Sequence, residues 1–344
     1  ADLHADSLLW GRDLLRRSRR GHVDLPRLVE GNVALQVFTV VSAMPFFANP
    51  WRTPAVADMV TALGVLQRWP FRTWPSRYQR ARYHAERLHR FAVASDGRLV
   101  IVRRAADLDR AAGGLRVAAL LGSEGAQVLE GKLENVDALF DAGFRLLGLT
   151  HFFDNEVAGS AHGWRKGGLT PLGRQVIARM EQLGMIVDLA HASPATLDEV
   201  TALAARPVLV SHAGVCGTCD NPRNLTDDQL RRVASTGGLV GITFFRYATG
   251  GTTADAIVRA IRHAADTVGV DHVALGSDWD GAVRTPFDAS GLPVLTDGLL
   301  AAGFAEDEIA AVMGENVRRV LKTILPTAGG REGGRAGERE GGRA

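Results

Sequence analysis

The 344-residue sequence predicts an α/β protein with the (β/α)8 or TIM-barrel fold. Three observations support this prediction. Eight short apolar runs recur along the chain, and most gaps between them have a helical pattern. Continuous apolar runs are typical of parallel strands, because both faces of a parallel sheet are covered. A doubly wound open sheet would need a Gly-rich phosphate turn after an early strand, and the sequence has none there. The barrel is therefore favoured over the open sheet.

The first two strands are predicted at residues 1–6 (ADLHAD) and 33–41 (VALQVFTVV). The other six follow at residues 116–124, 144–151, 185–191, 207–212, 238–245 and 272–278. The gap at 46–114 is too long for a simple crossover and holds two amphipathic stretches, at 51–69 and 76–91. It predicts a largely helical insertion between strands 2 and 3, packed on the barrel. The Arg-rich second stretch predicts a solvent-exposed helix face.

Two of the connecting helices carry clear end signals. In TPLGRQVIARMEQLG, Thr170 is a candidate N-cap, Pro171 suits the first helical position, and Gly184 suits the end. In TDDQLRRVASTGG, Thr226 is the candidate cap, acids fill the first turn, and glycines end the helix.

The predicted barrel domain covers residues 1–325. Residues 326–344 are rich in Gly, Arg and Glu and cannot bury apolar area, so we expect them to be disordered. A net charge of +2 gives no reason to expect nucleic acid as a partner. No apolar run approaches the roughly 18 residues of a transmembrane helix, so we expect no transmembrane segment.

The chain begins at Ala1, three residues before His4, with no apolar signal segment. We expect either that a leader was removed before Ala1 or that the chain is trimmed relative to its gene. The localisation stays open between a soluble cytoplasmic protein and a periplasmic or secreted one.

Cys216 and Cys219 form a single C-x-x-C pair in GVCGTCD. One such pair cannot make a four-cysteine zinc site. The favoured interpretation is two small loop residues, and the alternative is a local disulfide.

Ionisable residues mark the carboxyl ends of six predicted strands. In chain order these are His4 and Asp6, Glu124, His151, His191, His212 and Asp278. In a (β/α)8 barrel the carboxyl ends of the strands surround one mouth, where catalytic groups sit. Alternate residues of a strand share a face, so His4 and Asp6 both point into the barrel.

Each of these residues has an ordinary alternative role. A histidine in a barrel can be a hydrogen-bonded core residue, an acid can cap a helix, and Asp278 and Asp280 can be turn residues. As a group, however, buried charges need a partner of opposite sign, and a divalent metal supplies one. The remaining histidines lie in loops, helices or a strand start and are not expected to be ligands: His22, His84, His89, His162, His263 and His272.

Histidines combined with carboxylates suit zinc, although manganese or cobalt could substitute. A pair of metal ions needs a bridging carboxylate, and Glu124, alone at its strand end, is the natural candidate. A bridging water would then be a hydroxide near neutral pH, and the metals would polarise a carbonyl. This chemistry is hydrolysis.

Several motifs together resemble the membrane (renal) dipeptidase family of the amidohydrolase superfamily. In order, they are DLHADS, VDLPRLVEGNVALQVF, GSEGA, LTH, VDLAHAS, VLVSHAG, NPRNLTDD, LGSDWDG and MGENVRRVL. They span roughly residues 2–325. The loop HFFDNEVAGSAHG lacks the tryptophan of the mammalian enzyme and resembles bacterial members, which leaves the side-chain specificity open.

The resemblance implies a zinc-dependent dipeptidase with a binuclear site. One zinc ion would take His4, Asp6 and the bridging Glu124, and the other would take Glu124, His191 and His212. His151 would stabilise the oxyanion of the tetrahedral intermediate. Arg223 would bind the carboxylate of the dipeptide. Asp278 would carry a proton to the leaving amine.

The resemblance also implies a homodimer. It places Cys216 and Cys219 between His212 and Arg223, where a disulfide would stiffen the substrate rim. Two other functions are compatible with the same predicted barrel. The same metal site could act on another amide, an N-acyl amino acid, a lactone or a β-lactam. A non-catalytic metal-binding homologue is disfavoured, because every predicted ligand and helper group is present.

Overall fold

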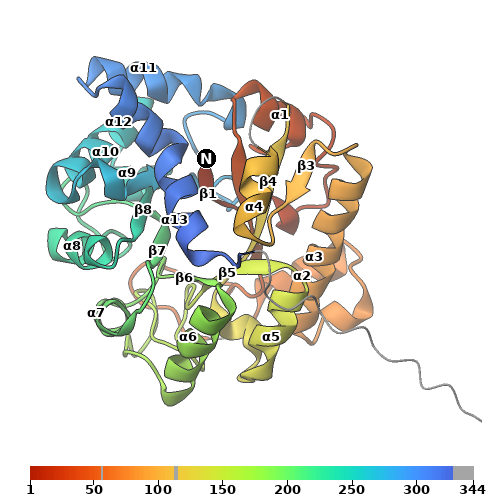
Figure 1. The fold of residues 1–344 in the computed structure, drawn as a ribbon. Helices are drawn as coiled ribbons and strands as arrows, with labels where there is room; N and C mark the ends of the chain where they lie inside the picture. Colours follow the sequence, from red (N-terminus) through yellow and green to blue (C-terminus); the bar gives the residue numbers. More distant parts are fainter. Residues whose placement is uncertain (56, 112–114, 328–344) are drawn as a thin grey trace, which may run out of the picture.

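The computed structural model describes residues 1–55, 57–111 and 115–327 of the chain. Eight parallel strands form a nearly closed barrel, surrounded by helices, as the sequence predicts (Figure 1). Neighbouring strands pair in the order β1-β2-β4-β5-β6-β7-β8-β9. The barrel strands are β1 (Asp2–Ala5), β2 (Leu35–Val41), β4 (Val117–Glu124), β5 (Phe144–Gly148), β6 (Ile186–Asp188), β7 (Leu209–Ala213), β8 (Leu239–Ile242) and β9 (Val273–Leu275).

Helices follow most barrel strands and lie on the outside. They are α1 (Leu25–Glu30), α5 (Glu134–Asp141), α6 (Pro171–Leu183), α7 (Pro194–Leu203), α8 (Asp227–Ser235), α9 (Arg246–Thr249), α10 (Ala254–Val268), α11 (Pro293–Ala301), α12 (Glu306–Ala310) and α13 (Asn316–Ile324). Within the described residues, no helix combines the length and the apolar character needed to cross a bilayer.

The first motif is an ordered strand. Residues of β1 pair with β2 in parallel, with Asp2 opposite Gln36 and Ala5 opposite Phe38. The barrel closes on the other side of β1 through a single parallel bridge between Ala5 and Trp279, where the Asp6 amide donates to the Trp279 carbonyl at 2.9 Å. The opening segment therefore lies between the second and the last strand of the barrel, as expected.

Apolar side chains fill the half of the barrel where the strands begin. They include Leu3, Val37, Leu120, Leu146, Ile186, Leu209, Leu239 and Ala274. The apolar face of α13 joins the same cluster through Val317, Val320, Leu321 and Ile324, and Figure 1 shows this helix beside the start of β1. Buried polar groups gather at the opposite end, where the strands finish.

The segment between β2 and β4 is largely helical, as predicted. It holds α2 (Met59–Leu66), α3 (Arg77–Ala94) and α4 (Ala105–Ala111). The prediction missed a short strand, β3 (Leu99–Ile101), which pairs in parallel with the start of β4 outside the barrel. Three residues are too few for a periodic signal, and tertiary pairing decides their conformation.

The solvated face expected of the Arg-rich helix, α3, does not include two of its arginines. Arg80 and Arg87 are buried. Arg87 donates to the carbonyls of Leu8 and Trp10, which follow β1. Burial is tolerated because planar guanidinium groups can satisfy several carbonyls at once.

Both predicted helix caps are present. The Thr170 hydroxyl accepts from the Gly173 amide at the start of α6, and Gly184 ends that helix with a φ of 71°. Thr226 and Gln229 form a capping box at the start of α8. The predicted disordered tail lies almost wholly outside the described residues, which end at residue 327.

Candidate metal centre and active site

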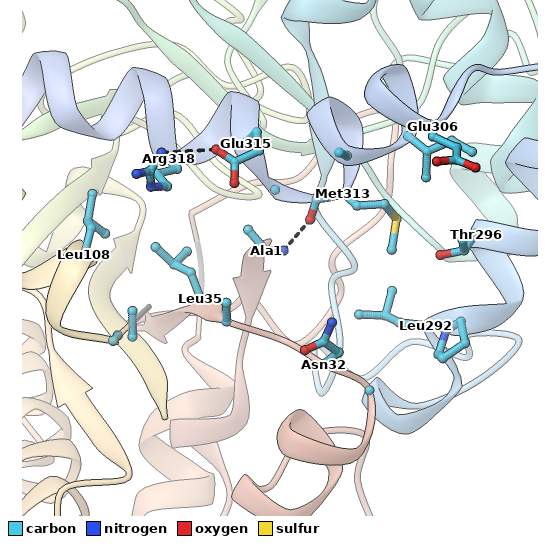
Figure 2. A pocket seen from close by; sticks show the side chains of 18 of the residues that line it. Ala1, Asn32, Leu35, Leu108, Leu292, Thr296, Glu306, Met313, Glu315 and Arg318 are labelled. Carbon is cyan, nitrogen blue, oxygen red and sulfur yellow. Dashed lines mark hydrogen bonds and ion pairs between the residues drawn. The ribbon is translucent and has the colours of Figure 1, made fainter. Parts of the chain in front are cut away.

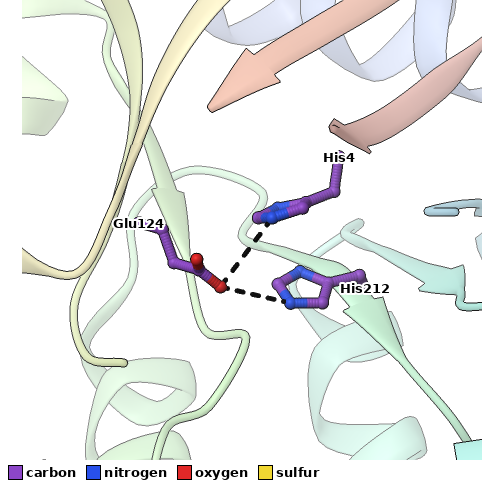
Figure 3. A group of neighbouring side chains, drawn as sticks. All are labelled: His4, Glu124 and His212. Atoms are coloured by element: carbon purple, nitrogen blue, oxygen red, sulfur yellow. Dashed lines mark ion pairs between the residues drawn. The ribbon is translucent and has the colours of Figure 1, made fainter. Parts of the chain in front are cut away.

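The predicted strand-end residues converge on the carboxylate of Glu124, the last residue of β4. Its Oε1 lies 3.1 Å from His191 Nε2, 3.4 Å from His212 Nε2 and 3.8 Å from His4 Nε2. Its Oε2 lies 3.3 Å from His151 Nε2. Figure 3 shows the Glu124 carboxylate facing the adjacent rings of His4 and His212. All five side chains are buried.

His4, on β1, and Asp6, the residue that follows this strand, lie beside each other in the cluster. His4 Nε2 lies 3.4 Å from Asp6 Oδ1 and 4.0 Å from Asp278 Oδ1. Thr39, on β2, donates its hydroxyl to Asp6 Oδ1 at 2.7 Å. Within the described residues, these side chains supply groups whose ligand atoms all lie within 4.8 Å of one another: His4, Glu124 and His212; Glu124, His151 and His191; and His4, Asp6 and Asp278.

The donor atoms of His191, His212 and Glu124 have a spacing that suits one zinc ion. The two Nε2 atoms lie 3.1 Å apart, and their distances to Glu124 Oε1 are 3.1 and 3.4 Å. Ligand atoms on a tetrahedral zinc ion with bonds of 2.0–2.1 Å lie about 3.3 Å apart. Two neutral imidazole lone pairs that face each other also need a proton or a cation between them. The residues therefore fit a divalent metal ion.

The pKa shifts show how strongly this site favours positive charge. Burial opposes protonation of His4, but Asp6 and Glu124 outweigh it and raise the pKa of His4 to about 10. Burial, then Asp6, raises the pKa of Glu124 well above its usual range. Burial also raises the pKa of Asp278 to about 7. Crowded, buried carboxylates resist ionisation unless a cation lies beside them.

The histidines opposite are held neutral. Burial lowers the pKa of His151 to about 4. Burial and the Arg223 guanidinium keep the pKa of His191 well below its usual range, and burial and His4 do the same for His212. Neutral imidazole is the form that binds a metal ion.

Four site residues lie just beyond the strands that were predicted to contain them: Asp6, His151, His191 and Asp278. The predicted strands at 185–191 and 272–278 end at Asp188 and Leu275 in the structure. The backbone φ angles are 63° at His191 and 62° at Asp278. This left-handed conformation cannot continue a strand, and for residues other than glycine it carries strain that tends to occur at functional sites. The turns aim both side chains into the mouth.

Ser211 and Asp188 support the histidines from behind, and the sequence analysis missed both. Ser211 Oγ lies 2.9 Å from His212 Nδ1 and 3.4 Å from His4 Nδ1, and it donates to Asp188 Oδ2 at 2.7 Å. Such outer partners fix the orientation of ligand histidines. Asp188 is an acid inside the apolar run MIVDLAH, and this unusual position is the sequence feature that could have pointed to its role.

His151 and Arg223 complete the mouth. His151 Nδ1 lies 3.3 Å from the Ala43 carbonyl oxygen, which leaves Nε2 facing Glu124. Arg223 is buried, and its Nη2 donates to the His212 carbonyl. In the part of the chain that the structure describes, its Nε and Nη1 have no hydrogen-bond partner. Asp278 and Glu124 are among the charges that act on Arg223.

Asp280 belongs to the structure around the site rather than to the cluster on Glu124. Its carboxylate accepts from Ser7 Oγ at 2.6 Å and from the His22 amide at 2.7 Å, and it pairs with Arg12. These bonds tie the turn after β9 to the segment after β1. Asp280 is therefore a structural turn residue, as the alternative interpretation proposed.

Cys216 and Cys219 are free thiols in the structure. Each Sγ lies 3.5 Å from a backbone carbonyl, that of Asn224 for Cys216 and that of Tyr247 for Cys219. The interpretation as small loop residues therefore agrees with the structure, and the disulfide alternative does not.

A pocket of about 920 Å³ lies at the opposite end of the barrel (Figure 2). Its lining includes Ala1, Leu35 and Ala118 at the strand starts, together with Met313 and Arg318. None of the predicted site residues lines it. The strand-start end of a barrel serves stability rather than catalysis.

Comparison with protein families and known structures gives a consistent result. Residues 1–330 match the model of a family described as membrane dipeptidase, peptidase family M19. The chain is 32% identical over 244 residues to dipeptidase verJ of Clonostachys rogersoniana, and the aligned region covers 69% of this chain and 63% of that protein. It is 35% identical over 217 residues to an uncharacterised dipeptidase, C3A11.10c, of Schizosaccharomyces pombe, which covers 60% and 53% respectively. The chain thus spans between half and two thirds of these relatives' lengths.

The fold is also similar to solved structures. A metallo peptidase from Rhodobacter sphaeroides, liganded with a phosphinate mimic of the dipeptide L-Ala-D-Ala, has a TM-score of 0.77 and 26% identity, with 94% of this chain and 98% of that chain covered. Another structure, described as dipeptidase AC of family M19, has a TM-score of 0.75 and 25% identity, with 90% and 91% covered.

Proposed function

Because this chain belongs to the membrane dipeptidase family, peptidase family M19, we propose that it is a metal-dependent dipeptidase with a binuclear centre. The observation that carries the proposal is the convergence of His4, His191, His212 and Asp6 around the buried Glu124 carboxylate. The similarity to a metallo peptidase that was solved with a dipeptide mimic supports the same substrate class.

In this proposal His4, Asp6 and Glu124 would hold one divalent ion, and Glu124, His191 and His212 would hold the other. The mixed nitrogen and oxygen donors favour zinc, with manganese or cobalt as substitutes. When bound, the ions supply Lewis acidity and lower the pKa of a water molecule, so that it can attack a peptide carbonyl near neutral pH.

The protein's own residues position the dipeptide. The unpartnered Nε and Nη1 of Arg223 offer a planar pair of donors to the substrate's carboxylate. His151, at the mouth beside Glu124, donates from Nε2 to the oxygen on which negative charge develops when its ring is protonated, because Nδ1 already gives its hydrogen to the Ala43 carbonyl. Its Nδ1 lies close to the Ala43 carbonyl, which holds the ring in place.

Asp278 carries the proton in this scheme. Its buried carboxylate lies beside the proposed ligands, where it can accept a proton from the attacking water and return it to the leaving amine. Its Oδ1 lies 4.0 Å from His4 Nε2, at the rim of the proposed centre.

The test combines metal analysis with activity. We expect elemental analysis of the purified protein to find about two zinc ions per chain. Removing them with a chelator should lower dipeptide hydrolysis by roughly 100-fold or more, because several kcal/mol of transition-state stabilisation depend on the ions. Added Zn²⁺, Mn²⁺ or Co²⁺ should restore it. Normal turnover by the metal-free protein would contradict the proposal.

A substrate panel separates dipeptides from the alternative substrates. Free L-L and L-D dipeptides should be hydrolysed, whereas the same dipeptides with amidated carboxyl ends should not, because Arg223 then lacks its anionic partner. Comparable rates on N-acyl amino acids, lactones or β-lactams would assign the same metal site to another substrate class.

We also propose that the protein is a homodimer, which rests on the family resemblance alone. Light scattering should then give a mass of about twice the 36.8 kDa of one chain. A mass equal to that of one chain would contradict it.

A further inference from the structure

His162 lies next to the proposed centre, although it was excluded as a ligand from the sequence. It follows β5 in the loop GSAHG and is only 1% exposed. Its ring stacks on Phe152 at a centroid distance of 4.8 Å and meets the His191 ring at 5.1 Å with an angle of 66°. Neither the predicted ligand set nor the proposed substrate contacts give this buried histidine a role.

The hydrogen bonds of His162 define its tautomer. Nδ1 lies 2.7 Å from the carbonyl oxygen of Pro50. A carbonyl can only accept, so Nδ1 carries the hydrogen and donates it. Nε2 of the neutral ring then has a lone pair and is an acceptor. This atom is buried, and within the described residues it has no hydrogen-bond partner.

His191 has the complementary requirement. Its Nε2 faces Glu124 and His212, each at 3.1 Å, which is the direction of the proposed metal ion. A neutral imidazole that binds a metal through Nε2 carries a hydrogen on Nδ1 and needs an acceptor for it. In the described part of the chain, this Nδ1 is also buried without a partner.

The other two ligand histidines already have such support. Ser211 Oγ lies 2.9 Å from His212 Nδ1 and 3.4 Å from His4 Nδ1. His191 is the exception among the three, and the ring of His162, with its free acceptor, lies beside its own ring.

Backbone pairing holds the two rings side by side. The Ala161 amide donates to the His191 carbonyl at 2.8 Å, and Ser160 and Ala192 form an antiparallel bridge. On these observations we propose that His162 is a positioning residue, whose Nε2 accepts the Nδ1 hydrogen of His191, directly or through one water molecule. The inference rests on the proposed metal centre and adds an outer partner that orients one of its ligands.

Two substitutions separate the two nitrogens of His162. In His162→Asn the amide nitrogen reaches the position of Nδ1, so the bond to Pro50 can persist while the acceptor is lost. In His162→Gln the longer side chain places an amide oxygen near the position of Nε2, so an acceptor is kept. His84→Asn is the matched control, because His84 is a buried histidine of α3 whose Nε2 also has no partner among the described residues.

The measurement is Co²⁺ titration of the metal-free proteins, followed by visible absorption, with steady-state kinetics in parallel. We expect His162→Asn to bind the second Co²⁺ ion 10–100-fold more weakly and to shift its absorption bands. His162→Gln should retain most of the affinity, and His84→Asn should bind as the wild type does.

Other outcomes would overturn the inference. Wild-type Co²⁺ affinity and spectrum in His162→Asn, with only a higher KM, would assign Nε2 to the substrate. Equal losses in the Asn and Gln variants, matched by equal drops in the melting temperature of the metal-free proteins, would indicate a purely structural role. If the wild type itself binds no second ion, the binuclear proposal fails as well, so the two failures are distinguishable.

Discussion

Arg223 shows how one side chain can set the substrate class. One nitrogen of its guanidinium is used by the His212 carbonyl, and in the described chain Nε and Nη1 have no partner. We expect Arg223→Lys to raise KM for free dipeptides by about 10–100-fold, because a lysine keeps the charge but loses the planar pair of donors, whose charge-assisted bonds contribute about 1.5–3 kcal/mol.

Steady-state kinetics on free and amidated dipeptides measures this effect, and metal content serves as the control. Since Arg223 is not a proposed ligand, two ions per chain should remain in the variant. An unchanged KM would contradict the assigned role.

His84 makes a pH prediction that is independent of the metal centre. Burial, helped by Arg87 and Arg80, lowers the pKa of His84 to about 3. Between its ordinary value of 6.5 and about 3, the unfolded chain binds a proton that the folded protein excludes, so the free energy of unfolding falls as the pH falls. At pH 5 this contribution is about 2 kcal/mol.

Urea unfolding of metal-free wild type and His84→Phe at pH 7 and pH 5 checks this prediction. Phenylalanine keeps the edge contact with Trp69, whose ring lies 4.6 Å from that of His84. The loss of stability between the two pH values should be about 2 kcal/mol smaller in the variant. Equal losses would show that His84 takes up a proton in the folded state.

The predicted ligand residues could be found from the sequence because the barrel rule places strand ends together. His4, Glu124 and His212 needed only a correct strand assignment. His162 and Ser211 could not be found in this way. Ser211 is an ordinary strand residue in sequence, and His162 reaches the site through the path of a long loop, which periodicity does not encode.

Among the elements, the insertion depends on one buried arginine. The guanidinium of Arg80 bonds to five groups from three stretches of the chain: Ser42, Asp58, Thr61, Thr73 and Trp74. We expect Arg80→Lys to lower the free energy of unfolding by about 3 kcal/mol, because an ammonium cannot reach all five and leaves buried partners unsatisfied. Exposed Arg90 on the same helix provides the control variant, Arg90→Lys.

Urea unfolding and limited proteolysis would measure this effect. Cleavage of the Arg80→Lys protein should concentrate at residues 46–76, since these lose their anchor first. If both variants unfold at the same urea concentration, the arginine is not the anchor.

Element boundaries were the least predictable part of the fold. The ends of α6 and α8 were predicted correctly, because the capping residues Thr170, Gly184 and Thr226 are visible in the local sequence. Four strand ends were placed three residues too far along the chain; at two of them His191 and Asp278 follow the strand in a left-handed conformation that polar patterning does not reveal.

At the scale of the whole molecule, the proposed metal centre lies over the seam of the barrel. The seam joins β1 to the segment after β9 through one bridge, whereas β2 and β4 pair over seven residues. His4, Asp6 and Glu124 would share ions across the mouth, so metal binding should stabilise the closed barrel.

Metal removal should therefore lower the melting temperature. An ion at a free concentration of 100 times its dissociation constant adds about 2.7 kcal/mol to the free energy of unfolding. Hydrogen exchange should rise most at residues 2–6 and 273–280. Uniform exchange along the chain, or an unchanged melting temperature, would show that the barrel does not depend on the centre.

The hydrogen bonds at the start of the insertion have a consequence for redesign and for divergence within the family. The Ala43 carbonyl lies 3.3 Å from His151 Nδ1, the Pro50 carbonyl binds His162, and the Thr53 amide donates to the His162 carbonyl at 2.6 Å. This stretch is therefore not a detachable module. Exchanging it between homologues to alter substrate preference would also change the histidines beside the catalytic mouth, so loop and barrel must be transplanted together.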